Sequence, residues 1–244
     1  MKKTIAIIGY GRFGRFAAHH LKKKFRVFVA DWKKTIRVEP GINKISMQEA
    51  AKMGNIILAV PINALPSLLR TIAPLLKPGT LVCDVSSVKE EPIRWMKSIL
   101  PGYVSILGTH PLFGPDSATG SFTGKTIVLC PVRISSARLR NIRRHLNKEG
   151  LIVQQMTPTK HDQLMASTLF LTQFIGRAVH RLNLPPPTSS THNFELLHYI
   201  ASTSQKDSKE LFHDMYRFNR YARKTPEQLL KAVQKLSHIL EVKS

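Results

Sequence analysis

The 244-residue sequence contains only two cysteines, Cys83 and Cys130, and both fall in short apolar runs typical of strands. Two thiols cannot form the dense disulfide framework of a small secreted domain, and we expect both to be buried and reduced. No apolar run approaches the roughly 20 residues that a membrane-spanning helix needs, so we predict no membrane partner. Met1 lies three residues before the first predicted strand, which leaves no room for a signal peptide. We therefore expect a cytoplasmic protein.

Acidic residues are also scarce, because 15 Asp and Glu stand against 37 Lys and Arg, a formal net charge of +22. A field of this sign attracts anions, which include phosphates, dianionic substrates and nucleic acid. The basic residues are scattered rather than gathered in one block, and aromatic residues do not alternate with them as in base-stacking surfaces. We predict no specific nucleic-acid partner. A non-catalytic nucleotide-sensing or nucleic-acid-binding protein stays open as an alternative.

Hydrophobic residues make up 43% of the chain and charged residues 21%, which is typical of a soluble globular protein. Through residue 154, apolar strand-like runs alternate with helical patterns, and this order predicts a Rossmann-like, doubly wound α/β sheet. The expected strands cover 4–8, 26–31, 56–60, 80–84, 103–108 and 125–130. The expected helices between them cover 13–23, 62–73, 88–99 and 135–148.

The pattern becomes purely helical near residue 155, so we predict one domain over 1–154 and an all-α C-terminal domain over 155–244. Thr157-Pro158 is typical of a helix start, and apolar residues then recur at helical spacing from Leu164 to Leu182. A proline-rich loop is expected over 184–188. The helices expected after this loop cover 191–203, 207–222 and 226–240.

The first predicted strand runs directly into Gly9-Tyr10-Gly11-Arg12-Phe13-Gly14, and a helical pattern follows. In a dinucleotide-binding βαβ unit the first glycine allows the tight turn, the second lets the backbone approach a pyrophosphate, and the third lets helix and strand pack closely. The helix N-terminus then offers N–H groups to the phosphates. We predict a nicotinamide dinucleotide site whose residues are Gly9, Gly11, Arg12, Phe13, Gly14, Asp31, Val60 and Pro61.

Asp31 ends the second predicted strand, 17 residues after Gly14, where a carboxylate can bind the diol of an adenosine ribose. This position favours NAD, because a carboxylate repels the 2′-phosphate of NADP. Lys33, Lys34 and Arg37 follow closely and could neutralise that phosphate, so NADP is the alternative cofactor. Asp31 could also be a surface residue that merely ends a strand.

Ser87, Lys89 and His110 follow or end the fourth and fifth predicted strands. Ligands of open α/β sheets bind beyond the carboxyl ends of the strands, so we expect the three side chains to converge on one crevice. A histidine titrates near neutral pH, and His110 beside a nicotinamide therefore predicts a dehydrogenase with a histidine base. Ser87 could instead cap the next helix, with Glu90 completing a capping box, and His110 could be a surface histidine. No metal site is predicted.

With these motifs the chain resembles the prephenate/arogenate dehydrogenases of tyrosine biosynthesis over nearly its whole length. The resemblance rests on the glycine turn, on Asp84-Val-Ser-Ser-Val-Lys-Glu-Glu-Pro92, on Thr109-His-Pro-Leu-Phe-Gly-Pro-Asp116 and on His161-Asp162. The plant-type branch that uses arogenate is the most similar one, because of the segment Phe113-Gly-Pro-Asp116 together with Asp207-Ser208 and Tyr216-Arg-Phe-Asn219.

The resemblance implies NAD(P)-dependent oxidative decarboxylation of prephenate or arogenate to 4-hydroxyphenylpyruvate or tyrosine. It implies that His110 takes the proton of the substrate's 4-hydroxyl and that Ser87 orients His110 or that hydroxyl. Five residues are then expected to contact the substrate: Ser87, Lys89, His110, His161 and Gln173. His161 could instead be a surface residue of its helix. The family also implies a homodimer formed by the helical domain, for which the Leu164–Leu182 stripe is a candidate, although a buried core face explains that stripe equally well.

Gln173 and Thr203 stand where prephenate-using bacterial relatives carry a histidine and an arginine that recognise substrate carboxylates. The loss of a bidentate carboxylate partner favours arogenate, or use of either substrate. Arg177, Lys206 or Arg217 could supply the missing charge. A generic dehydrogenase of small hydroxy acids is the other enzymatic alternative, because a fold does not fix a substrate.

Overall fold

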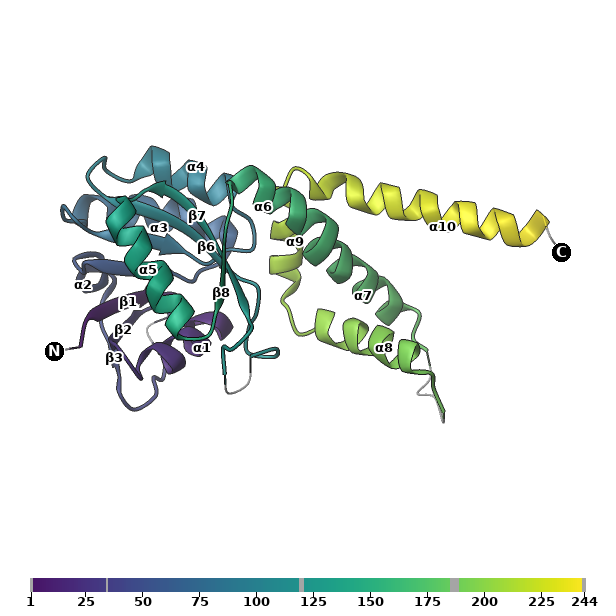
Figure 1. Ribbon diagram of the computed structural model, residues 1–244, viewed down its shortest axis with the longest axis horizontal. Helices are drawn as coiled ribbons and strands as arrows, with labels where there is room; N and C mark the ends of the chain where they lie inside the picture. Colours follow the sequence, from purple (N-terminus) through teal and green to yellow (C-terminus); the bar gives the residue numbers. More distant parts are fainter. Residues whose placement is uncertain (1, 34, 119–120, 185–188, 243–244) are drawn as a thin grey trace. The chain divides into compact units, whose positions relative to one another are not determined.

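The computed structural model describes residues 2–33, 35–118, 121–184 and 189–242 and divides into two compact units (Figure 1). The units are Met1–Pro158 and Thr159–Ser244. The sequence places the domain boundary after residue 154, which lies inside the last strand of the first unit, whereas the structure divides after Pro158.

The first unit is built on one eight-stranded sheet with the order β3-β2-β1-β4-β5-β6-β7-β8. Strands β1 to β6 pair in parallel, β7 runs antiparallel to β6, and β8 runs parallel to β7. The bounds are β1 Thr4–Ile8, β2 Arg26–Ala30, β3 Ile42–Lys44, β4 Asn55–Leu58, β5 Leu81–Asp84, β6 Ser105–Pro111, β7 Thr126–Arg133 and β8 Ile152–Gln155. The chain goes from β1 to β2 on one side and later to β4 on the other, which confirms the doubly wound sheet and sets its switch point between β1 and β4.

Helices cover both faces of this sheet because its central strands are apolar on both sides. One face carries α1 (Arg12–Leu21) over Ile7 and Val29, and α5 (Ser136–Lys148) over Leu107 and Leu129. The other face carries a single larger core under three helices, α2 (Met47–Ala51), α3 (Leu65–Ile72) and α4 (Glu90–Ile99). Short 3₁₀ turns, η1 (Ile62–Ala64) and η2 (Ala73–Leu75), flank α3.

Three short elements of the first unit, β3, α2 and β8, lie where no element is expected from the sequence. The five-residue α2 is held by a capping box, in which Ser46 Oγ accepts from the Glu49 N–H at 3.2 Å and Glu49 Oε2 accepts from the Ser46 N–H at 2.8 Å. Strand β3 has three residues and β8 has four, too few to show a hydrophobic period.

The second unit is entirely helical over its described residues, as predicted. Its elements are α6 (Pro158–Met165), the π-helix η3 (Ala166–Phe170), α7 (Leu171–Arg181), α8 (His192–Ser204), α9 (Lys209–Phe218), the 3₁₀ turn η4 (Ala222–Lys224) and α10 (Thr225–Val242). Residues 185–188 of the predicted proline-rich loop lie outside the described residues.

A π-helical turn interrupts the helix that the sequence predicts between Pro158 and Leu182. The hydroxyls of Ser167 and Thr168 donate to the Leu164 carbonyl at 3.1 and 2.7 Å, and such bonds compete with the regular helical ladder. Phe170 in this segment is buried and stacks on Phe212 of α9 with 5.4 Å between ring centroids, whereas Leu164, Leu171 and Phe174 of the predicted stripe are half-buried and Leu182 is exposed.

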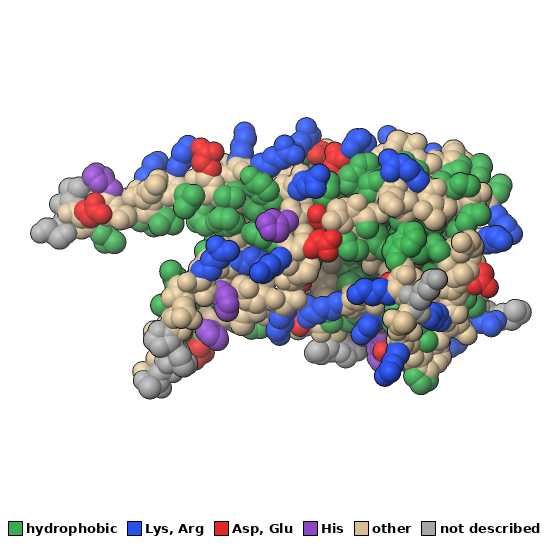
Figure 2. Space-filling view, turned by 180° about the vertical axis from the view of Figure 1, so that it is seen from behind, with side chains coloured by type: hydrophobic (Ala, Val, Ile, Leu, Met, Phe, Trp, Pro, Cys, Tyr) green, Lys and Arg blue, Asp and Glu red, His purple; other side chains and the backbone are tan. Residues whose placement is uncertain are grey.

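The surface is rich in basic side chains and poor in acidic ones, in line with the net charge of +22. Figure 2 shows Lys and Arg side chains scattered over one face of both units, with few Asp and Glu among them. No described helix combines the length and the apolar character that a membrane crossing requires.

Candidate active site

The carboxyl ends of five parallel strands carry the predicted site residues of the first unit along one edge of the sheet. In the lateral order β2, β1, β4, β5 and β6, these ends present Asp31, the glycine turn, Val60-Pro61, Ser87 and His110. Neighbouring strands lie about 4.8 Å apart, so the four spacings make a row about 19 Å long. The structure thus brings residues from five separate segments to one edge, around the switch point between β1 and β4.

The glycine turn leaves no room for side chains at Gly9 and Gly14. A Cβ on Gly9, whose φ is +100°, would lie 2.3 Å from the Ala59 carbonyl oxygen, and a Cβ on Gly14 would lie 2.0 Å from the Gly9 carbonyl oxygen. A Cβ on Gly11 would meet no described atom within 4 Å. Gly11 is also the N-cap of α1, and its position gives the N–H groups of the first turn no side-chain cap. This arrangement suits a phosphate.

Asp31 ties the end of β2 to the glycine turn. Its carboxylate accepts hydrogen bonds from the Tyr10 N–H at 2.6 Å and from the Lys33 N–H at 2.8 Å. A carboxylate offers about four acceptor sites, so Asp31 can hold these two donors and still accept from a ribose diol. Lys33 and Arg37 are exposed nearby in the sequence, and Lys34 lies outside the described residues.

Arg12 connects the glycine turn to the loop that follows His110, because its guanidinium forms an ion pair with Asp116. Phe113 and Phe122 pack on Phe16 of α1, with ring centroids 6.3 and 6.0 Å apart. These contacts bring the loop after β6 against α1, although 104 residues separate Arg12 from Asp116 in the chain.

Lys89, predicted to contact the substrate, is instead completely buried. Its ammonium forms an ion pair with the equally buried carboxylate of Asp84, the last residue of β5. Asp84 Oδ2 also accepts from the Ser86 N–H at 3.0 Å. An ammonium can enter the interior at this point because a carboxylate neutralises it there. The structure therefore does not support Lys89 as a substrate contact.

Ser87 does not cap the next helix, so that alternative is wrong. Helix α4 begins at Glu90, and Lys89 occupies its N-cap position without a side-chain cap. The Ser87 hydroxyl is buried, and it has no hydrogen-bond partner among the described residues. Leaving a buried polar group without a partner costs about 1–3 kcal/mol, so this hydroxyl is suited to receive a bond from a ligand or a water.

His110 lies in β6, one residue before its end, and its exposed fraction is 7%, so the surface alternative is wrong. On one side its backbone pairs with Val128 of β7. On the other side the hydroxyl of the preceding Thr109 donates to the Asp84 carbonyl oxygen at 2.5 Å and joins β6 to β5. A base on a central strand is held more rigidly than one on a loop.

We find no support for a thiol nucleophile or a metal site among the described residues at this edge. Burial raises the pKa of the Cys83 thiol to about 12, and the neighbouring Asp84 carboxylate adds to the rise, so Cys83 is not a nucleophile near neutral pH. Neither cysteine forms a disulfide; Cys130 is buried as expected, whereas the Cys83 residue is half-buried and not fully buried. Among the residues that the structure describes, no three His, Cys, Asp or Glu side chains gather as they would around a metal ion.

In the second unit, His161 is fully buried and faces Asp162, with 2.7 Å between His161 Nδ1 and Asp162 Oδ1. The surface alternative for His161 is therefore wrong. Asn219, at the end of α9, donates to the Asp162 carbonyl oxygen at 2.8 Å and joins α9 to α6.

Gln173 of α7 forms a cluster with Arg177 and Asp207 that the sequence analysis does not predict. Gln173 Nε2 donates to Asp207 Oδ2 at 2.7 Å, and Arg177 Nη2 donates to the Asp207 carbonyl oxygen at 2.8 Å. Gln173 Oε1 and Arg177 Nε are buried without partners in the described part of the chain. Thr203 instead bonds within its own helix, to the Tyr199 carbonyl oxygen at 2.8 Å.

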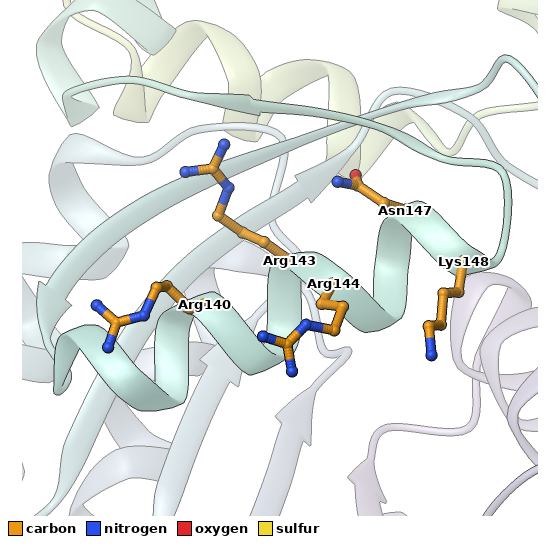
Figure 3. Close-up of a pocket in the computed structure, with 5 residues that line it drawn as sticks. All are labelled: Arg140, Arg143, Arg144, Asn147 and Lys148. Atoms are coloured by element: carbon orange, nitrogen blue, oxygen red, sulfur yellow. The ribbon is translucent and has the colours of Figure 1, made fainter.

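A surface recess of about 490 Å³ is lined by residues of α5 (Figure 3). Figure 3 shows Arg140, Arg144 and Lys148 on one side of the helix, and Arg143 and Asn147 on the other. The recess contains none of the predicted site residues.

A sequence model of the prephenate dehydrogenase nucleotide-binding domain matches residues 30–155. A second model, described as the TYRAAT1-like C-terminal domain, matches residues 179–244. The two matches together cover most of both units.

Two curated proteins are similar in sequence. A probable arogenate/prephenate dehydrogenase of Methanocaldococcus jannaschii is 30% identical over 257 residues, covering 98% of this chain and 57% of its own length. Arogenate dehydrogenase 2 of Arabidopsis thaliana, a chloroplastic protein, is 31% identical over 238 residues, covering 92% of this chain and 66% of its own length. The chain thus spans somewhat more than half of the first relative and about two thirds of the second.

Among solved structures, a prephenate dehydrogenase from A. aeolicus, crystallised with hydroxyphenyl propionate and NAD+, matches with a TM-score of 0.76. The match covers 100% of this chain and 92% of that one, at 18% sequence identity. At this identity the likeness establishes the fold.

Proposed function

The chain belongs to the prephenate dehydrogenase family, and we propose that it catalyses the NAD(P)-dependent oxidative decarboxylation of a cyclohexadienyl acid, prephenate or arogenate. The observation that supports this proposal is the row of strand ends. In it a turn shaped for a pyrophosphate shares one edge with buried His110 and with the Ser87 hydroxyl, which has no partner among the described residues. This edge combines a dinucleotide site with a proton acceptor, which are the two groups that the reaction needs.

The residues at the switch point fit a dinucleotide. Gly9 and Gly14 allow no side chain, Gly11 faces open space, and the uncapped start of α1 suits the pyrophosphate, with Arg12 beside it. Asp31 would accept the ribose hydroxyls, which favours NAD over NADP. Val60 and Pro61 follow the adjacent strand β4 and would line the same site. When bound, the nicotinamide accepts a hydride.

His110 is the proposed base. It would accept the proton of the substrate's 4-hydroxyl while the hydrogen on the same carbon leaves with its electron pair as hydride. The ring carboxylate then leaves as CO2, and the electron pair of its bond completes the aromatic ring. His110 can return its proton to the phenolate oxygen formed in that step, so the histidine ends the cycle neutral. Ser87 would bond to the reacting hydroxyl or to His110.

Gln173 and His161 are the substrate contacts that we propose in the second unit. Gln173 Oε1 is a buried acceptor without a described partner, so it can receive a bond from a substrate donor but not from a carboxylate, and the amide carries no charge where the prephenate-using relatives have a histidine. A neutral amide is a weaker partner for a carboxylate than a cation is, which favours arogenate over prephenate.

We also propose a homodimer formed through α10. Leu230, Val233, Leu236 and Leu240 recur on this helix at spacings of three or four residues, and each is more than half exposed. An apolar stripe of this kind on a long helix is typical of a helix–helix contact. Light scattering should give twice the chain mass for the wild type and the chain mass for Leu236→Lys, whereas a monomeric wild type would exclude this proposal.

A crossed assay tests the proposed function. Purified protein is mixed with NAD or NADP and with prephenate or arogenate, and the absorbance of the reduced nicotinamide is followed. We expect turnover in at least one combination, with NAD and arogenate the fastest. Dinucleotide binding is measured separately by calorimetry. Binding without turnover in all four combinations would exclude the proposal, and turnover of a small hydroxy acid alone would favour the generic dehydrogenase.

A further inference from the structure

The buried pair of Asp84 and Lys89 lies on the same face of the sheet as His110. Asp84 is in register with Gly108 of the neighbouring parallel strand β6, and His110 is two residues further along that strand. Side chains alternate along a strand, so Asp84, Gly108 and His110 share one face. The diagonal between the Cα atoms of Asp84 and His110 is about 8 Å, from one strand spacing and two residue rises. Gly108 has no side chain that could separate them.

The pair joins the segments that carry both proposed catalytic groups. Asp84 ends β5, its Oδ2 holds the Ser86 N–H, and its carbonyl oxygen holds the Thr109 hydroxyl. Lys89 occupies the N-cap position of α4 and reaches back to Asp84. Ser87 lies in the loop closed by this ion pair, and His110 directly follows Thr109. A change at Asp84 or Lys89 therefore acts on both groups through one connected set of contacts.

Helix α4 packs directly over this part of the sheet. A Cβ on Gly108 would lie 2.8 Å from Ile93 Cδ1 of α4 and 3.3 Å from Cys130 Cβ of β7. The helix, the loop and β6 are thus in close contact around the pair, and neither charge reaches solvent.

The elements packed against β6 carry other charged and titratable groups, and these differ from Asp84 and Lys89 in their orientation, exposure or bonding partners. Cys83 of β5 points to the opposite face by alternation, and Arg133 of β7 bonds the Val104 carbonyl oxygen at 2.7 Å. On α4, Glu91 and Arg94 form an exposed pair. The remaining such groups on these elements are the buried thiol of Cys130 of β7, half-buried Glu90 of α4 and exposed Lys97 of α4.

We infer that Asp84 and Lys89 are positioning residues for Ser87 and His110, and that their opposite charges cancel in their effect on the protonation of His110. The inference rests on the proposed function of His110 as the base. A buried carboxylate alone would stabilise the imidazolium, and a buried ammonium alone would destabilise it. The intact pair holds the loop without fixing His110 in either protonation state.

The test is the pH profile of kcat/KM, whose acid limb reports the base in the free enzyme. Lys89→Met leaves the carboxylate unpaired and should move the acid limb to higher pH by about one unit, and Asp84→Asn should move it to lower pH by about one unit. The double variant should return the limb to its wild-type position with a reduced kcat. Lys89→Arg keeps the charge and should leave the limb in place.

The exposed pair on α4 provides the matched control, because Glu91→Gln and Arg94→Met remove the same two charges from a solvated position. Both should leave the profile unchanged. Shifts of equal sign in Lys89→Met and Asp84→Asn, or a loss of kcat with no shift in either, would show a merely structural pair and overturn the inference.

Two further measurements keep the inference testable where a single variant fails to fold or the reaction is absent. Thr109→Val removes the bond to the Asp84 carbonyl but no charge, and should lower kcat about tenfold with an unchanged dinucleotide KM, while Thr109→Ser restores it. A wild-type kcat in Thr109→Val would contradict the positioning role. NMR titration of the His110 ring, with its signal assigned by its loss in His110→Asn, measures the direction of the His110 pKa change in Lys89→Met and in Asp84→Asn without any turnover. A failure of the proposed reaction is thereby distinguished from a failure of this inference.

Discussion

The two units bury their polar residues in different ways. In the first unit the polar groups follow strand ends, and their positions are fixed by the parallel register of the sheet, as for Asp84 beside Gly108. In the second unit they stand on helices or in the turn between two helices and pair through side chains, as in His161–Asp162 and Gln173–Asp207; Asp84 and Lys89 are the side-chain pair of the first unit. A group held on a strand is positioned rigidly, which suits bond-breaking chemistry, while a side-chain cluster can be altered by substitution without moving a strand. We therefore assign the proposed chemistry to the first unit and the proposed choice of substrate to the second.

The largest expected effect is the loss of the base in the first unit. His110→Asn keeps a polar side chain on β6 but cannot take the hydroxyl proton, and kcat should fall by about 10²–10⁴, the usual contribution of general acid–base catalysis. Dinucleotide affinity, measured by calorimetry, should stay near the wild-type value. Substantial turnover in this variant would remove His110 from the mechanism.

The next effect concerns the glycine turn. Gly11→Ala meets no described protein atom within 4 Å, so the thermal midpoint should fall only slightly, because alanine is a poorer N-cap than glycine, while the new methyl group occupies the approach of the pyrophosphate. We expect dinucleotide affinity to fall about tenfold or more, a loss of about 1.4 kcal/mol. Gly102→Ala is the control, because a Cβ there also meets no described atom within 4 Å and lies far from the turn in the sequence. Equal affinity in both variants would contradict the phosphate site.

A smaller and different effect is expected at Gln173. Gln173→Ala should raise the KM for the substrate about tenfold with little change in kcat, because a binding contact in the ground state is lost. Gln173→His restores a group that can carry charge and should improve prephenate relative to arogenate. Steady-state kinetics with both substrates measure the two effects. A fall in kcat at constant KM would place Gln173 in the chemical step and would contradict the assignment of the chemistry to the first unit alone.

The smallest effect is at the thiols of the first unit. Because burial raises the pKa of Cys83 to about 12, almost no thiolate exists at pH 8 in the folded protein, about one molecule in 10⁴. Iodoacetamide at pH 8 should leave native Cys83 unmodified and should modify it in denaturant, as read by mass spectrometry. Reactivity should begin only as the pH approaches 12. Rapid modification of the native protein at neutral pH would show that the end of β5 opens readily.

The structural features that the sequence predicts correctly are those that depend on short contiguous segments of the chain. The strand, glycine turn and helix over residues 4–21 are contiguous, and the steric needs of Gly9 and Gly14 appear directly as residue types. The bond from Thr109 to Asp84 joins residues 25 apart and depends on the β5–β6 register, which no local pattern contains. The alternative role of Ser87 as a helix cap fails for the same reason: Lys89 pairs with Asp84, and α4 begins only after Lys89.

Two other features that the sequence analysis does not predict, α2 and the π-helical turn, are nevertheless indicated by the local sequence. Ser46 and Glu49 have the spacing of a capping box, and the structure forms that box at α2. The π-helical turn coincides with adjacent Ser167 and Thr168, whose hydroxyls bond to backbone carbonyls. The cluster around Asp207 had no such signal, because Asp207 lies between α8 and α9, 34 and 30 residues after Gln173 and Arg177 of α7.

The most direct measurement is the ratio of CO2 released to nicotinamide reduced in one sample, with the aromatic product identified by mass spectrometry. Oxidative decarboxylation at His110 predicts one CO2 for each reduced nicotinamide, and a parallel loss of both in His110→Asn. Reduced nicotinamide without CO2 would mean that the chain oxidises a hydroxy acid without decarboxylation and would contradict the account.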